Sequence, residues 1–108
     1  FPGWKRRLNG SPREENVQFN LYATFRLLAG IKTVNLDLPE GITVRQAVNA
    51  LLITHPVLRP HWLDNAGNLH AHVHIFVNGD DLQTLAGGIE TPLKPGDVLD
   101  FIPPVGGG

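Results

Sequence analysis

A single amphipathic helix pattern stands near the middle of this sequence of 108 residues, with strand patterns on both sides of it. Thr43 and Gln46 form a capping box, in which each side chain satisfies a backbone N–H of the first helical turn. From Val44 to about Thr54, apolar residues recur at helical spacing on one face, and Pro56 prevents continuation. A chain of this length supports one domain, so this helix is expected to cover one face of one sheet.

The strands before the helix are predicted from period-two alternation. Residues 17–25 place apolar side chains on one face and polar side chains on the other, which is typical of a half-buried strand. Residues 34–38 repeat the pattern after a connection around Ala29-Gly30. The two segments are therefore expected to form a hairpin.

The segment after the helix alternates in the same way. Residues 70–77 form a predicted strand, Asn78-Gly79 a tight turn, a short strand is expected around Leu82, and residues 97–102 form the last strand. If the first and last strands are neighbours at the centre, their connection through the helix makes them parallel. The order predicts an α+β roll, with a mixed four- to five-stranded sheet packed on one main helix. The residues expected in its core are Phe19, Leu21, Val48, Leu51 and Ile75.

The composition narrows the choice of partners. Nine Lys and Arg stand against ten Asp and Glu, and no basic stripe follows any predicted element, so nucleic acid is not expected to bind. No apolar run approaches the roughly 20 residues that span a bilayer, so no membrane partner is expected. The absence of cysteine fits a reducing, cytoplasmic location and leaves no side-chain thiol that could carry sulfur.

Both ends of the sequence differ from the domain at residues 17–102. Residues 1–16 show no helical or strand period and are expected to form a flexible N-terminal tail. Residues 103–108 are expected to form an extended C-terminal tail, because Pro103 and Pro104 lack backbone N–H groups and end strand pairing. The tail continues with Val105, Gly106, Gly107 and Gly108.

The three glycines give a thread without side chains, which can enter a narrow channel in a partner. Its reactive group is the carboxylate of Gly108. A carboxylate is a poor acyl donor at neutral pH and must be activated, usually by attack on the α-phosphate of ATP. A partner is expected to supply that catalysis, because no nucleophile–base pair or metal constellation is visible and no side chain is assigned a catalytic role.

Three segments of the chain closely resemble the MoaD/ThiS family, which includes the small archaeal modifier proteins. They are residues 77–79, 91–97 and 101–108, and the ending Pro-Pro-Val-Gly-Gly-Gly is the most specific of them. The resemblance covers about residues 17–108. It implies the ubiquitin-like β-grasp fold.

The resemblance also implies a function and its partners. An E1-like adenylyltransferase would use ATP to activate Gly108, and a persulfide sulfur donor would leave a thiocarboxylate there. As a sulfur carrier, the chain would serve a molybdopterin synthase large subunit, itself being the small subunit. Alternatively, it is a modifier joined through Gly108 to lysines of target proteins. A third alternative is a non-covalent β-grasp binding module, and an enzyme is the least expected class.

Two further clusters follow from the alternation of the strands. Phe76, Val98 and Ile102 are expected on the sheet face opposite the helix, where they would form a docking patch for the activating enzyme. The alternative is that the N-terminal tail, through Trp4, covers them. The second cluster, His70, His72 and His74, would share one strand face at spacings of roughly 6.5 to 7 Å. We expect partly exposed strand histidines there rather than a metal site.

Overall fold

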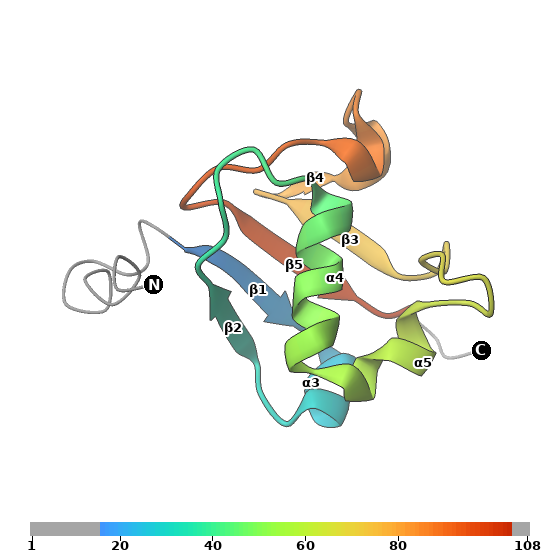
Figure 1. Ribbon diagram of the computed structural model, residues 1–108. Coiled ribbons are helices and arrows are strands. Elements are labelled where there is room, and N and C mark those ends of the chain that lie inside the picture. Colours follow the sequence, from blue (N-terminus) through green and yellow to red (C-terminus); the bar gives the residue numbers. More distant parts are fainter. Residues whose placement is uncertain (1–15, 105–108) are drawn as a thin grey trace, which may run out of the picture.

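A five-stranded mixed sheet forms the framework of the computed structural model, which describes residues 16–104 (Figure 1). The strand order is β2-β1-β5-β3-β4, with β1 and β5 parallel at the centre and the other pairs antiparallel. The strands are β1 Val17–Leu21, β2 Thr33–Leu36, β3 His74–Val77, β4 Asp80–Asp81 and β5 Val98–Ile102. The predicted α+β roll, with its parallel first and last strands, is confirmed.

The main helix, α4 Val44–Thr54, lies across one face of the sheet (Figure 1). Its capping box forms as predicted. The backbone N–H of Gln46 donates to Thr43 Oγ1 at 3.2 Å, and the backbone N–H of Thr43 donates to Gln46 Oε1 at 3.0 Å. The buried side of the helix holds Val44, Ala47, Val48, Leu51 and Leu52. All the predicted core residues are buried, namely Phe19, Leu21, Val48, Leu51 and Ile75.

The predicted strand at residues 17–25 is wrong beyond Leu21. The chain turns there, with Ala23 at a φ of 52°, and enters the helix α3 Ala23–Ala29. Its Ala, Leu and Arg residues are strong helix formers, and Phe25 reaches the core from the helix as it would have from a strand. A helix, rather than a tight hairpin turn, therefore joins β1 to β2.

Two short helices follow α4 and were not predicted. The 3-10 helix η1 Pro56–Leu58 leads into α5 Arg59–Trp62. Trp62 is fully buried, stacks on Phe101 with ring centroids 4.6 Å apart, and meets Phe25 edge-on at 5.3 Å. Helices this short give no readable period in a sequence, so the core position of Trp62 could not be predicted from periodicity.

The predicted strand at residues 70–77 begins only at His74. β3 pairs with β5 as far as the His74–Ile102 position, and β5 is followed by Pro103, which has no N–H to donate. The preceding residues consequently lack a strand partner. They turn instead, with the Val73 N–H donating to the His70 carbonyl at 3.1 Å.

The short strand expected around Leu82 lies just before it. Asn78 and Gly79, at φ 51° and 89°, form the predicted tight turn into β4. Leu82 instead begins the 3-10 helix η2 Leu82–Thr84, and η3 Gly88–Glu90 follows. No helix within residues 16–104 is long and apolar enough to cross a membrane.

Candidate functional site

The exit of the C-terminal tail lies at the end of the central strand β5. β1 and β3 flank β5, and Ile102, its last residue, stands opposite His74. The Tyr22 N–H donates to the Phe101 carbonyl at 3.2 Å. Pro103 and Pro104 follow, half-buried and exposed respectively, and neither has an N–H for further pairing. The other predicted tail residues, Val105, Gly106, Gly107 and Gly108, lie outside the described residues.

An apolar group occupies the sheet face opposite α4. Along β5, Leu99 and Phe101 are buried toward the helix, whereas the alternating residues are half-buried on the other face. Val98 and Ile102 flank Asp100 on that face, and Phe76 of β3 stands beside Asp100 in the register. The sequence-predicted docking residues Phe76, Val98 and Ile102 thus surround one carboxylate on a common face.

A polar ladder crosses the same face from β5 to β2. Asp100 Oδ1 accepts hydrogen bonds from Asn20 Nδ2 at 2.9 Å and from the Tyr22 hydroxyl at 3.3 Å. Asn20 Oδ1 in turn accepts from Gln18 Nε2 and from Thr33 Oγ1, both at 3.0 Å. The face is therefore apolar over β5 and β3 and carries amides and hydroxyls over β1 and β2. The sequence showed each of these residues, but the ladder depends on the parallel register of Asn20 with Asp100.

The Tyr22 hydroxyl acts as a donor at the edge of this ladder. Burial raises the pKa of Tyr22, and the charge of Asp100 and the hydrogen bond to it raise this pKa further. The phenol therefore keeps its proton and can donate to the carboxylate. Tyr22 also follows directly on β1 and precedes α3. It therefore lies between the sheet face and the end of β5 from which the C-terminal tail leaves.

A second carboxylate, Asp97, fixes the place where β5 begins. It is only 5% exposed and accepts from Asn78 Nδ2 at 3.0 Å, the Lys94 N–H at 2.9 Å and Lys94 Nζ at 3.2 Å. Burial alone would raise the pKa of Asp97, but these hydrogen bonds and the Lys94 charge more than offset it and hold the pKa below its usual value. Asn78 Oδ1 also accepts from the Val98 N–H at 2.9 Å. These contacts join two of the segments that carry the family resemblance.

The histidines do not share a strand face as the spacing predicted. His70 and His72 precede β3, and their rings stack with centroids 4.6 Å apart, while His74 alone stands in the strand. Among residues 16–104, no group of three His, Cys, Asp or Glu side chains is placed to hold a metal ion.

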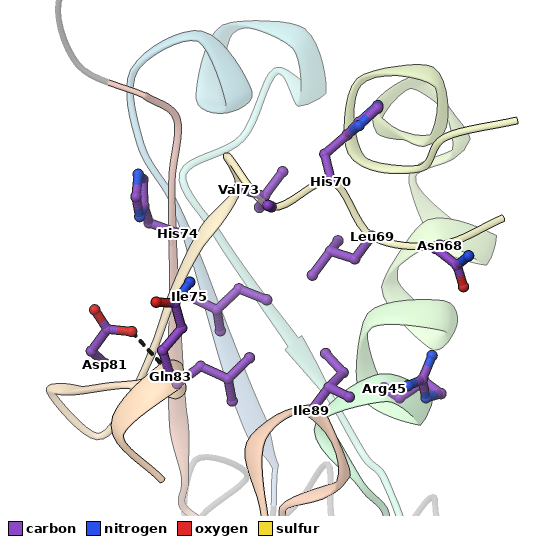
Figure 2. Close-up of a pocket in the computed structure, with 12 residues that line it drawn as sticks. Arg45, Asn68, Leu69, His70, Val73, His74, Ile75, Asp81, Gln83 and Ile89 are labelled. Atoms are coloured by element: carbon purple, nitrogen blue, oxygen red, sulfur yellow. Dashed lines mark hydrogen bonds between the residues drawn. The ribbon is translucent and has the colours of Figure 1, made fainter. Parts of the chain in front are cut away.

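A hollow of about 240 Å³ opens beside β3, and Figure 2 shows the residues around it. Leu69, Ile75 and Ile89 are among its apolar lining residues. Arg45 also lines it, but its Nε is held at 2.7 Å from Glu90 Oε2. The hollow was not predicted, because it depends on how the loop before β3 meets η2 and η3. Its lining residues contain no nucleophile–base pair.

Comparisons with known proteins agree with this fold. A model of the ThiS family matches residues 19–108. Small archaeal modifier protein 1 of Haloferax volcanii is 32% identical over 92 residues, which cover 85% of this chain and 100% of that protein. A crystal structure of SAMP1 from Haloferax volcanii aligns with a TM-score of 0.77 at 31% identity, covering 86% of this chain and 99% of that one. A chain in the crystal structure of the Amycolatopsis orientalis BexX/CysO complex aligns with a TM-score of 0.67 at 28% identity, covering 85% and 99%.

Proposed function

Since this chain belongs to the ThiS family of ubiquitin-like carriers and modifiers, we propose that it is a sulfur carrier activated at Gly108. The observation that supports this most is the position of β5. The tail follows directly on a strand held on both sides at the centre of the sheet, and Pro103-Pro104 ends the pairing. A partner can therefore draw in the tail while the domain stays folded.

The proposed chemistry takes place on the Gly108 carboxylate. An E1-like adenylyltransferase joins the carboxylate to the α-phosphate of ATP, and pyrophosphate leaves. The terminal sulfur of a persulfide donor then attacks the acyl carbon and releases AMP. A thiol cleaves the resulting S–S bond and leaves a thiocarboxylate. Because the chain contains no cysteine, Gly108 is the one place where it can carry sulfur covalently.

The proposed partners are an activating enzyme and a sulfur acceptor. The activating enzyme docks on the open face of β3 and β5, where Phe76, Val98 and Ile102 supply the apolar contact. The acceptor of the sulfur is a molybdopterin synthase large subunit, of which this chain is the small subunit. Both reactions belong to the cytoplasm, where thiols and ATP are available. The chain itself catalyses neither step.

Mass spectrometry of the intact chain tests this proposal. With a cognate activating enzyme, Mg-ATP and a persulfide donor, the mass should rise by about 16 Da as sulfur replaces one oxygen of Gly108. Deleting Gly107 and Gly108 should abolish the gain and leave the circular dichroism spectrum unchanged. Gly107→Val should impair the reaction, because a β-branched side chain obstructs a narrow channel and restricts φ and ψ. Sulfur found on any side chain, or a full gain by the truncated chain, would contradict the carrier role.

Protein modification is the second candidate function, and it is favoured by the name of the relative that is 32% identical, a small archaeal modifier protein. A lysine amine would then attack the acyl carbon of the same adenylate, which forms the isopeptide bond and releases AMP. Incubation with the activating enzyme and ATP, without a sulfur donor, distinguishes the two roles. An isopeptide bond from Gly108 to a lysine of another protein would favour the modifier. If neither product forms, the non-covalent binding module is the better account.

A further inference from the structure

Charge is distributed unevenly along the length of the domain. Most carboxylates of residues 16–104 lie toward the end of the sheet where β1 and β5 begin, namely Asp37, Glu40, Asp80, Asp81, Glu90 and Asp97. Two cations at that end are each held by one of these carboxylates. Arg45 pairs with Glu90 at 2.7 Å and Lys94 with Asp97 at 3.2 Å. We call the opposite end, where β1 and β5 both finish and the tail leaves, the exit end (Figure 1).

The remaining cations of the described chain gather at the exit end. Arg26 lies in α3, directly after β1. The carbonyl of Lys32 accepts from the N–H of Leu21, the last residue of β1, at 2.7 Å. Arg59 begins α5, the helix whose last residue stacks on the ring of Phe101. Within residues 16–104, none of these three cations has a carboxylate within ion-pair distance.

Exposed apolar side chains lie on α3, at the end of α4 and on η1. Leu27 of α3 is 79% exposed, Ile53 at the end of α4 is 78% exposed, and Val57 of η1 is 46% exposed. α3 and the end of α4 both pack against η1. The other large apolar residues that are exposed in the described chain, Tyr22 and Ile31, flank α3 on either side. These side chains therefore lie on adjoining elements, and large exposed apolar side chains grouped in this way are typical of an interaction surface.

Between residues 16 and 104, no carboxylate pairs with the cations of this surface. Residues 22–32 and 50–63, which form it, contain neither Asp nor Glu. Asp64 follows this surface in the chain, but its Oδ1 accepts from the N–H groups of Ala66 and Asn68 at 2.9 and 3.0 Å. Asp100 meets the surface at the Tyr22 hydroxyl and belongs to the ladder of the sheet face. The exit end therefore presents apolar side chains among cations that have no carboxylate partner in the described part of the chain.

We propose that the exit end is a docking surface for an acidic protein, one that presents apolar side chains ringed by carboxylates. Charge complementarity selects this partner. An anionic membrane is the weaker match, because lipid-binding surfaces gather about four to eight Lys and Arg, more than stand here. The inference goes beyond the proposed function, because binding at this surface does not require activation of Gly108. The exit end is also a different surface from the predicted docking patch on the β3–β5 face.

A synthetic amphipathic peptide with a leucine face flanked by glutamates tests the inference, using the full ¹⁵N-labelled chain and NMR titration. Shift changes are expected at α3, the end of α4, η1 and α5, and binding should weaken as salt rises. A peptide with lysine in place of each glutamate is the matched control and should not bind. Shift changes centred on the β3–β5 face, or equal binding of the two peptides, would overturn the proposal.

Charge-reversal variants locate the surface independently. Arg26→Glu combined with Arg59→Glu should weaken binding of the acidic peptide by about tenfold or more, because it replaces attraction by repulsion. Arg45→Glu reverses one charge at the other end and should leave binding intact. All three residues are exposed, and circular dichroism checks the fold. Equal loss in both variants contradicts the proposal. So does binding to phosphatidylglycerol vesicles without binding to the peptide, or self-association through this end in sedimentation.

Discussion

The side chain of Asp97 connects the turn after β3 to the turn before β5. Its two carboxylate oxygens accept from Asn78 and from both the backbone and the ammonium group of Lys94. Each of these donors favours the ionised form of the carboxylate. The buried charge of Asp97 therefore helps to hold the start of the central strand, at whose other end the tail leaves the sheet.

This carboxylate should make stability depend on pH. Because the folded pKa of Asp97 lies below the reference value of 3.8, its contribution is fully present above that pH and is lost as pH falls through the folded pKa. Asp97→Asn should lower the free energy of unfolding at pH 7 by about 1–3 kcal/mol and flatten its dependence on pH below about 4. Urea denaturation followed by circular dichroism from pH 2 to 7 measures both effects. Asp80→Asn, at an exposed position of the short strand β4, is the control and should change neither quantity.

A substitution of Phe76 tests whether the activating enzyme docks on the face formed by β3 and β5. If the activating enzyme docks there, Phe76→Ala should raise the KM for this chain in ATP–pyrophosphate exchange by about tenfold with little change in kcat, since a central aromatic contact is lost. Asn35→Ala is the matched control, because Asn35 is an exposed residue of the edge strand β2. An unchanged KM for the Phe76 variant would remove the β3–β5 face from the docking model.

The helix α4 shows how an element divides its residues between core and solvent. Leu51 is fully buried and Ile53, two positions later, is 78% exposed. Leu51→Ala should lower the free energy of unfolding by about 2 to 5 kcal/mol, through lost burial and the cavity left behind. Ile53→Ala in the same helix should change it by about 0.5 kcal/mol or less. Urea denaturation of the two variants compares them, and a small cost for Leu51→Ala would contradict its place in the core.

The elements also show what the sequence could and could not reveal. α4 was predicted because its cap and its apolar face are both local signals. The first strand was extended wrongly to Phe25, because a buried residue four positions after Leu21 fits helical spacing as well as strand alternation. Trp62 was missed because it sits in a helix of one turn. Both errors concern α3 and α5, short elements whose positions depend on packing around Phe101 rather than on local pattern.

The candidate site was likewise predicted where local patterns determine it and missed where contacts between distant segments determine it. Alternation along the strands was enough to place Phe76, Val98 and Ile102 on one face, because every second side chain of a strand points to the same side of the sheet. The ladder on Asp100 could not be predicted, since it needs the register between strands 80 residues apart in the chain. The tail chemistry at Gly108 rests on sequence alone and stays a prediction.

At the scale of the whole molecule, the parallel pairing of β1 with β5 determines how the domain bears a load. The chain enters β1 beside the start of β5, where the Gly96 N–H donates to the Asn16 carbonyl at 3.0 Å, and leaves from the far end of β5. Tension between these two points pulls the strands past each other along their length. The hydrogen bonds between them are then loaded together in shear, rather than broken one after another.

Single-molecule pulling should reveal this difference. Force applied between residues 16 and 104 should unfold the domain at a higher value than force applied between Val17 and Leu36, which face each other across β1 and β2 and would be unzipped from one end. Equal unfolding forces would show that the β1–β5 pairing is not the mechanical clamp. With such a clamp, a partner can pull on the tail without unfolding the domain, because the β1–β5 hydrogen bonds resist the force together.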